Sequence, residues 1–280
     1  MIDLEKTKAP LVAAVVQLSS QADVDENLAR AEHWIAEAAR AGAQLVALPE
    51  NFAFMGEEVD KCRIAEPLTP PFGLIGSTIV RAATRAGVFV VAGGMPEKSG
   101  DQTRPFNTSV LFSPEGHLLA RYRKVHLFDV DLPDGTKLEE SRGTSSGSPA
   151  DLPVTELLGL GLGMTVCYDL RFPEIFRALE SRGARVVTVP AAFTLTTGKD
   201  HWHTLLRARA IENQIFVLAP GQTGKHPRGR QTYGKSLIVD PWGDVLAQVG
   251  EGEGFAIARL DPAYQDKVRQ ALPCLSHKRL

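Results

Sequence analysis

Three side chains of types that can do chemistry, Glu50, Lys124 and Cys167, each stand at or just beyond the end of a stretch that is expected to form a strand. A cysteine can attack a carbonyl carbon, and a carboxylate can remove a proton and return it. An ammonium group can stabilise the negative charge that develops on oxygen. If the fold brings these groups together, the chemistry they predict is acyl transfer through a thioester, followed by hydrolysis.

The segment around Cys167 predicts a strand, a tight turn and a helix. The apolar run 161–166 ends at the cysteine, and Pro173 suits the first position of a helix, where a missing N–H costs nothing. This pattern is typical of a nucleophile elbow, and the positive end of a helix dipole beside it favours a thiolate. The alternative is a buried structural cysteine that acts as a small apolar side chain.

The other candidate groups also have alternative interpretations. A glutamate such as Glu50 is most often solvated in a loop, and Lys124 lies in a basic cluster that is typical of a protein surface. We expect no metal and no cofactor, because three histidines do not have the spacing of a metal site: His126, His201 and His203.

Apolar runs of strand length alternate with helical patterns along the chain. Strands are predicted at 11–18, 45–49 and 88–92, the last ended by Gly93, and two more flank a turn at 113–116. Helices are predicted from Asp23 or Asp25 to Gly42 and from Gly73 to Gly87. Segment 54–71 is expected to be a short helix plus a loop.

The second half of the chain repeats this plan. A Ser-x4-Pro-x-Gly motif at 109–116 recurs at 236–243, an offset of 127 residues. The segment around Gly42 recurs around Gly183 at an offset of 141. The difference between the two offsets indicates an insertion in the first half, which we assign to 54–71.

This order of elements predicts an α/β fold with largely parallel sheets. Two halves that each form a sheet would stack into a four-layer α-β-β-α sandwich, and a single continuous sheet is the alternative. Glu50 and Cys167 would lie at the C-terminal ends of strands from different halves, where ligands bind in α/β sheets. Ala191 takes the place equivalent to Glu50, so the scaffold does not require the acid.

Composition excludes several classes of function. The chain has 280 residues, a formal net charge of −2 and no long run of like charge, so we expect neither a nucleic-acid nor a membrane partner. Its three cysteines are far apart and form no disulfide framework or CxxC pair. Residues 1–10 lack the pattern of a secretory signal. These features predict a cytoplasmic protein.

Three motifs in order resemble the nitrilase superfamily of carbon–nitrogen hydrolases. They are Leu-Pro-Glu at 48–50, Arg-Lys-Val-His-Leu-Phe at 123–128 and Cys-Tyr-Asp-Leu-Arg-Phe-Pro-Glu at 167–174. The resemblance covers almost the whole chain, and further matches at 193–198, 206–213 and 233–243 are similar to the Nit branch, which contains omega-amidases and deaminated-glutathione amidases.

The resemblance implies an α-β-β-α sandwich and a catalytic set of Glu50, Lys124 and Cys167, with no metal. It also implies that Glu140 is a second glutamate beside the lysine. In the mechanism we expect, Glu50 acts as base and then acid, and Lys124 with the backbone N–H of Tyr168 binds the oxyanion.

Substrate choice is also an expectation from the resemblance. It places Arg171 and Thr197 on a substrate carboxylate or keto group and Phe193 in the pocket wall. The alternative for Arg171 is a structural ion pair with Asp169 or Glu174. The basic loop at 225–230 is either a place for a second carboxylate or a solvated loop.

The run before this loop and the tail 272–279 resemble deaminated-glutathione amidases more than omega-amidases. We therefore predict an amide substrate of the N-(4-oxoglutaryl)-Cys-Gly type, cleaved to 2-oxoglutarate and Cys-Gly. The alternatives are an omega-amidase that acts on 2-oxoglutaramate or succinamate, and a non-catalytic interaction protein. We predict one catalytic domain at 10–262, a C-terminal extension at 263–280 that contributes to a dimer interface, and a homodimer or higher homo-oligomer.

Overall fold

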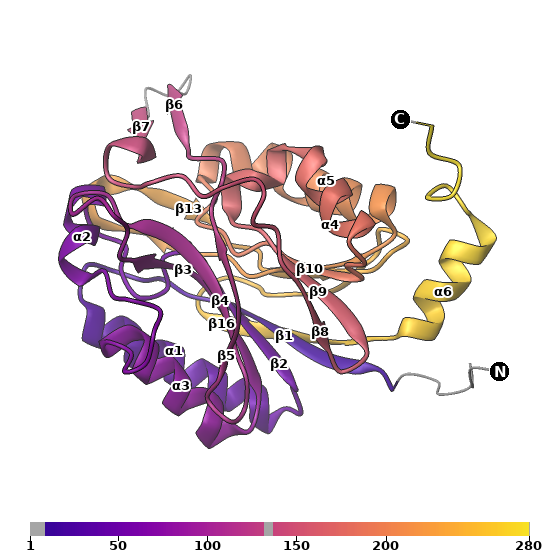
Figure 1. Ribbon diagram of the computed structural model, residues 1–280, viewed down its shortest axis with the longest axis horizontal. Coiled ribbons are helices and arrows are strands. Elements are labelled where there is room, and N and C mark those ends of the chain that lie inside the picture. The colour runs from indigo at the N-terminus through magenta and orange to yellow at the C-terminus, as the bar shows by residue number, and fades with distance from the viewer. Residues whose placement is uncertain (1–8, 132–136, 280) are drawn as a thin grey trace.

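Two six-stranded sheets, each covered by helices, form the body of the protein (Figure 1). This computed structural model describes residues 9–131 and 137–279. Residues 1–8 lie outside the described part of the chain. They belong to the segment 1–10 that was used to predict the location of the protein. The predicted four-layer α-β-β-α sandwich is confirmed, and the alternative of one continuous sheet is wrong.

The strands of the two sheets run in a fixed spatial order. The first sheet has the order β16 (Gly254–Leu260), β1 (Leu11–Gln17), β2 (Leu45–Leu48), β3 (Phe89–Glu97), β4 (Phe106–Phe112) and β5 (Leu118–Arg123). The second has β15 (Val245–Gln248), β14 (Leu237–Val239), β11 (Phe216–Ala219), β10 (Val186–Thr188), β9 (Leu160–Met164) and β8 (Val154–Leu157).

Helices and short hairpins complete the structure. The helices are α1 (Val24–Arg40), α2 (Lys61–Ile64), α3 (Leu74–Ala86), α4 (Pro173–Ser181), α5 (Leu195–Asn213) and α6 (Pro262–Ala271). Two hairpins lie outside the sheets: β6 (Asp129–Asp131) with β7 (Lys137–Glu139), and β12 (Thr223–Lys225) with β13 (Gln231–Tyr233). Short 3₁₀ turns span Glu58–Asp60, Glu140–Arg142, Cys167–Arg171 and Pro227–Gly229.

The layers follow from the period-two alternation of strand side chains. Leu11, Ala13 and Val15 of β1 belong to the core that includes the second sheet, whereas Ala14 and Val16 pack with residues of α1 and α3. Figure 1 shows α1 and α3 on one outer face and α4 and α5 on the other. Both faces of the central strands are therefore buried, which explains why their sequences are apolar without interruption.

Two expectations about the strands were wrong. Within the described residues, each sheet has two parallel and three antiparallel strand pairs, because hairpins and returning strands flank a parallel centre. The third strand also does not end at Gly93. It continues to Glu97 through an irregularity between Ala92 and Met95, where Gly94 adopts a φ of +71° that favours glycine.

The predicted repeat is confirmed at the level of hydrogen bonds. In the turn after β4, the N–H of Gly116 donates to Ser113 O, and 127 residues later the N–H of Gly243 donates to Asp240 O. The turns that end α1 and α4 match in the same way, and Gly42 and Gly183 both have a φ of +96°. The insertion at 54–71 contains α2 and a 3₁₀ turn, as expected.

The last strand joins the two halves. After β15, at the edge of the second sheet, the chain crosses over, and β16 pairs antiparallel with β1 along seven residues. Helix α6 then returns to the second half, where the Gln265 amide donates to the carbonyls of Arg185 and Gln214. In the described part of the chain, no helix is long and apolar enough to span a membrane.

Candidate active site

Glu50, just beyond the C-terminal end of β2, is held by hydrogen bonds from the second half of the chain. Its backbone carbonyl accepts a hydrogen bond from the Gln222 amide at 3.0 Å, and its Oε2 accepts one from the Ala192 N–H at 2.9 Å. The irregularity in β3 makes room for the side chain, because a Cβ on Gly94 would lie 2.9 Å from Glu50 Cγ. Glu50 is only 3% exposed, so the interpretation as a solvated loop carboxylate is wrong.

Lys124 follows β5 and points into the same buried space. Its Nζ lies 3.0 Å from Glu50 Oε1 and 2.7 Å from Glu140 Oε2. The residue is 1% exposed, so the interpretation as a surface lysine is also wrong. A fully buried ammonium requires such partners, since removing a charge from water without compensation is very costly.

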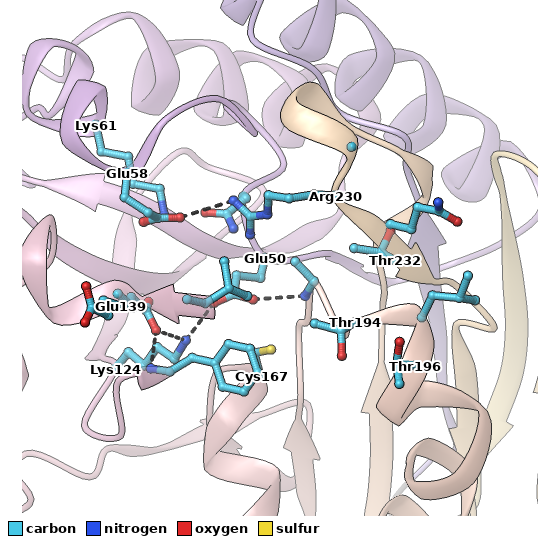
Figure 2. Close-up of a pocket in the computed structure, with 18 residues that line it drawn as sticks. Glu50, Glu58, Lys61, Lys124, Glu139, Cys167, Thr194, Thr196, Arg230 and Thr232 are labelled. Atoms are coloured by element: carbon cyan, nitrogen blue, oxygen red, sulfur yellow. Dashed lines mark hydrogen bonds and ion pairs between the residues drawn. The ribbon is translucent and has the colours of Figure 1, made fainter. Parts of the chain in front are cut away.

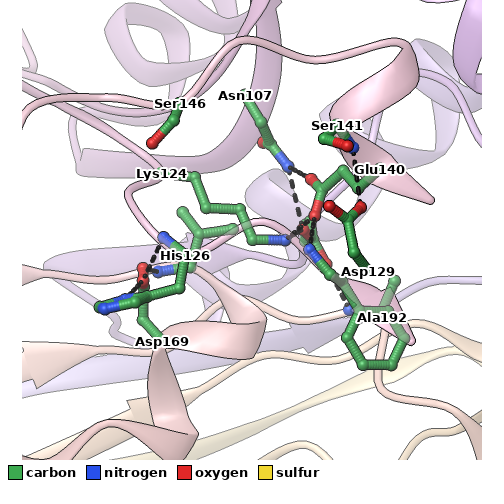
Figure 3. A network of polar contacts seen from close by, with 12 residues as sticks. Asn107, Lys124, His126, Asp129, Glu140, Ser141, Ser146, Asp169 and Ala192 are labelled. Carbon is green, nitrogen blue, oxygen red and sulfur yellow. Dashed lines mark hydrogen bonds and ion pairs between the residues drawn. The ribbon is translucent and has the colours of Figure 1, made fainter. Parts of the chain in front are cut away.

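Asn107 of β4 connects the two carboxylates (Figure 3). Its side-chain N–H₂ donates to Glu50 Oε1 at 3.0 Å and to Glu140 Oε1 at 3.2 Å. The backbone N–H of Phe128 adds a third donor to Glu140, at 2.7 Å from Oε2. One buried ammonium and one amide thus keep two buried carboxylates in fixed orientations.

The charges in this cluster stabilise one another. Burial alone would lower the pKa of Lys124, but the carboxylates of Glu140 and Glu50 outweigh burial and raise that pKa well above its ordinary value. Burial alone would raise the pKa of Glu140, but the ammonium groups of Lys124 and Lys61 outweigh it, and this pKa is lowered. Lys124 is therefore a permanent cation and Glu140 a permanent anion at neutral pH.

Cys167 begins the 3₁₀ turn that follows β9, and Pro173 is the first residue of α4, as predicted. Its φ of +47° lies in the left-handed region, which costs a non-glycine residue about 1–3 kcal/mol and occurs at functional sites. Its backbone N–H donates to Pro190 O at 2.8 Å, which helps to hold this conformation. The strained turn fits the predicted nucleophile elbow.

The helix dipole at Cys167 is outweighed by the surroundings of its sulfur in the fold. Burial raises the pKa of the Cys167 thiol well above its ordinary value, and the nearby Glu50 carboxylate raises it further against the opposing effect of Lys124. The sequence argument considered the helix dipole but not the desolvation of the sulfur. The Glu50 carboxylate lines the same cavity as the thiol, which makes it the available proton acceptor.

A cavity of about 240 Å³ opens over these groups (Figure 2). Glu50, Lys124, Glu140 and Cys167 line its base. Four other parts of the chain contribute to its walls: the insertion of the first half, β7, the start of α5 and the segment 229–232 around the start of β13. The side chains that they place on the cavity include Glu58, Lys61, Leu138, Thr194, Thr196, Arg230 and Thr232. The three groups singled out first in the sequence thus share one cavity.

The predicted substrate-binding residues line a second, smaller recess that also reaches Cys167. Arg171, Phe193 and Thr197 line a recess of about 10 Å³ that also reaches Cys167 and Tyr168. Arg171 stacks over the Phe193 ring at 5.1 Å and contacts His201 Nδ1 at 3.2 Å. In the described residues no ion pair joins Arg171 to Asp169 or Glu174, so this alternative is not supported.

Asp169 fastens the cysteine turn to the lysine segment. Its fully buried carboxylate accepts from the Val166 N–H at 2.8 Å, next to Cys167, and from the Tyr122 hydroxyl at 2.8 Å. His126 Nδ1 lies 2.7 Å from the same carboxylate. One side chain therefore sets the positions of two segments that are about forty residues apart in the chain, at 122–126 and 166–167.

Sequence reasoning missed Asn107, the Ala192 N–H and this role of Asp169. A signal for Asn107 existed, since the strand 106–112 is apolar except for three consecutive polar residues at 107–109. A backbone N–H such as that of Ala192 leaves no mark in the sequence. Glu140 was assigned only by resemblance, and its contact with Lys124 agrees with that assignment.

Comparisons with known proteins agree with the geometry. The family model described as Carbon-nitrogen hydrolase matches residues 12–270. The chain belongs to the carbon–nitrogen hydrolase family. It is 46% identical to the deaminated glutathione amidase of Synechocystis sp., over 96% of this chain and 98% of that protein. It is 40% identical to the deaminated glutathione amidase of Homo sapiens, over 99% and 85% respectively.

A solved structure gives the same result for the fold. Saccharomyces cerevisiae Nit3, a member of branch 10 of the nitrilase superfamily, superimposes with a TM-score of 0.85 at 32% identity, over 95% of both chains. As a carbon–nitrogen hydrolase, this chain is an enzyme that cleaves amide carbon–nitrogen bonds. The resemblance noted in the sequence is confirmed.

Proposed function

We propose that this enzyme hydrolyses the amide bond of deaminated glutathione, with Cys167 as nucleophile, and that it thereby repairs a damaged metabolite. The observation that carries the proposal is the shared cavity in which Cys167, Glu50 and Lys124 meet. Similarity over nearly the full chain to amidases named for this substrate supports the choice of substrate.

In the first half of the reaction, Glu50 accepts the proton of the Cys167 thiol, and the sulfur attacks the amide carbon. Lys124 and the backbone N–H of Tyr168 bind the oxygen that becomes negative, and losing one such donor typically slows a reaction by about 10²–10³-fold. Glu50 then gives its proton to the departing nitrogen, so Cys-Gly leaves with a neutral amine. The 2-oxoglutaryl group stays on Cys167 as a thioester.

In the second half, Glu50 takes a proton from water, and the hydroxide attacks the thioester carbon. The carbon–sulfur bond breaks, 2-oxoglutarate is released, and the proton held by Glu50 returns to Cys167. Neutral Cys167 at rest is compatible with this cycle, because each proton that Glu50 takes is given back. Glu140 supports the cycle by keeping Lys124 charged and oriented.

The test is a comparison of kcat/KM for three amides. The proposal predicts release of 2-oxoglutarate from deaminated glutathione with a kcat/KM well above those for 2-oxoglutaramate and succinamate. A preference for the two small amides would make the enzyme an omega-amidase instead. Mass spectrometry of a rapidly quenched reaction should find the acyl group on Cys167. Unchanged hydrolysis by Cys167→Ala would contradict the mechanism and leave the non-catalytic interpretation open.

We also propose a homodimer in the cytoplasm. The three cysteines are free thiols, which suits a reducing compartment. Exposed apolar side chains at the C-terminal end, Tyr264 and Leu272, are candidates for the predicted contact through residues 263–280. Light scattering after size-exclusion chromatography tests the assembly. A monomeric mass across the micromolar range would reject the dimer, and fractionation of cells tests the location.

A further inference from the structure

A cluster of charged residues lies at the end of the cavity away from the thiol, and the mechanism does not use it. The carboxylate of Glu58, from the insertion of the first half, forms ion pairs with two cationic side chains. Lys61 Nζ lies 2.7 Å from Glu58 Oε2, and Arg230 Nη1 lies 3.4 Å from Glu58 Oε1. In Figure 2, Glu58 and Arg230 meet on the side of Glu50 opposite to Cys167. All three residues line the cavity.

We propose that Arg230, supported by Lys61 and oriented by Glu58, binds the terminal carboxylate of the leaving group. This inference rests on the proposed function and extends it, because it assigns the part of the site that selects a peptide-like leaving group over ammonia.

The size of the cavity supports a large leaving group. In an amidase that releases only ammonia, the leaving group is about the size of a water molecule. It needs a cavity volume of roughly 10–15 Å³. The space over Glu50 and Lys124 measures about 240 Å³. It can therefore hold a substrate whose leaving group has many atoms, such as a dipeptide.

The chemistry sets the direction in which the leaving group extends. Glu50 must protonate the departing nitrogen, so that nitrogen lies on the Glu50 side of the scissile carbon. Glu50 lines the large cavity, whereas the residues that line the recess at Arg171 do not include it. The leaving group thus extends from Glu50 toward Glu58 and Arg230.

Charge at the far end favours an anion. Glu58, Lys61 and Arg230 sum to one positive charge, whereas Glu50, Glu140 and Lys124 sum to one negative charge at the base of the cavity. A carboxylate is therefore repelled from the reacting carbon and attracted to the far end. Lys61 is 5% exposed, which places its charge in a medium where such attraction is strong.

Arg230 retains donors for a ligand. A guanidinium has five N–H donors in a planar fork that matches a carboxylate, and in the described residues Arg230 uses its side chain in a single contact, to Glu58. Its neighbour Arg228 provides a matched comparison. Arg228 pairs with Glu57, is largely exposed and does not line the cavity.

The experiment compares Arg230→Gln with Arg228→Gln on three substrates: deaminated glutathione, the same compound with a terminal glycinamide, and 2-oxoglutaramate. We expect wild type to prefer the free carboxylate over the amide at least about tenfold in kcat/KM, mainly through KM. Arg230→Gln should lower kcat/KM about 10–100-fold for the free carboxylate and change the other two less than about threefold. The kcat/KM of Arg230→Lys for the free carboxylate should lie between those of wild type and Arg230→Gln. The kcat/KM of Arg228→Gln should match that of wild type.

Four results would overturn the inference. Equal losses on the carboxylate and the glycinamide would show that Arg230 does not bind that carboxylate. An equal loss on 2-oxoglutaramate would assign Arg230 to the acyl group. Wild type that hydrolyses both forms equally would remove the need for a carboxylate site while leaving the proposed function intact. If wild type hydrolyses neither form, the proposed function fails and this inference fails with it.

Discussion

The two halves of the chain have the same fold but supply different chemistry. The ends of the equivalent strands β2 and β10 carry Glu50 in the first half and Ala191 in the second. The first half provides the groups that exchange protons and carry charge, whereas the second provides Cys167 and, next to Ala191, the backbone N–H that binds Glu50. The shared fold therefore does not dictate the chemistry, and in the proposed mechanism the reaction is divided between the two halves.

The largest effect should come from removing either end of the Glu50–Cys167 pair. Cys167→Ala removes the nucleophile, and we expect kcat to fall by at least about 10⁴-fold. Glu50→Gln keeps the shape but cannot accept a proton, so it should lower kcat about 10²–10⁴-fold. Steady-state kinetics measure both, and Cys62→Ala and Cys274→Ala serve as controls with activity near wild type. A Cys167→Ala protein that keeps a tenth of the wild-type activity would contradict the proposed role of Cys167 as nucleophile.

Lys124 should be the side chain on which both activity and stability depend. Lys124→Met leaves the carboxylates of Glu50 and Glu140 buried without their cation. Breaking a buried pair in this way costs about 3–5 kcal/mol, so the free energy of unfolding should fall by that amount in urea titrations. The exposed Lys199→Met is the control and should change it by less than about 0.5 kcal/mol. A Lys124→Met protein as stable as wild type would indicate that the carboxylates find other partners.

A smaller loss is expected from the contact that ties the two halves together near the site. Asp169→Asn weakens the hydrogen bonds to Val166, Tyr122 and His126, which should cost about 1–3 kcal/mol of stability. Because these bonds position Cys167 relative to Lys124, kcat should fall more than KM rises. Tyr122→Phe removes only one donor and should cost about 1 kcal/mol. Equal effects on kcat for a variant far from the site would argue against a positioning role.

The pH dependence of stability should differ between the two halves. The pKa of Glu140 is lowered on folding, so its stabilisation is present above the ordinary value of 4.5 and is lost as the pH falls through the lowered pKa. The pKa of Cys167 is raised above 9.0, so above that pH the unfolded chain ionises first and the folded state loses stability. Glu140→Gln should therefore reduce the loss in acid and Cys167→Ala the loss in alkali.

Thermal unfolding at a series of pH values checks this prediction. In acid, the difference in stability between wild type and Glu140→Gln should shrink as the pH falls. In alkali, Cys167→Ala should gain on wild type as the pH rises past 9. If the stability of Glu140→Gln and wild type changed equally with pH in acid, the pKa of Glu140 would not change on folding. Equal changes for Cys167→Ala and wild type in alkali would show the same for the pKa of Cys167.

The local pattern of the sequence was sufficient for much of the fold. Apolar runs of strand length and the turn glycines Gly42 and Gly183 indicated the elements and their repetition, because both record purely local constraints. The antiparallel edges and the crossing of β16 were not predictable in the same way. Strand direction and neighbour order depend on long-range packing that no single segment encodes.

The residues of the site were likewise predictable only where they depend on local sequence. Glu50 and Cys167 could be found because they directly follow strands, and Lys124 because it follows the last strand of the first half. Asn107, the Ala192 N–H and the cluster at Glu58 depend on contacts between residues distant in the chain. The raised pKa of the Cys167 thiol could not be inferred from the local helix dipole, because burial is a property of the whole folded chain.

The crossing of β16 has a consequence for synthesis on the ribosome. β1 is translated more than two hundred residues before β16, the strand that pairs with its outer side. Until residues 254–260 emerge from the exit tunnel, a nascent first half has an open edge onto which strands of other polypeptides can add. Pausing of translation before β16 should therefore increase the need for chaperones.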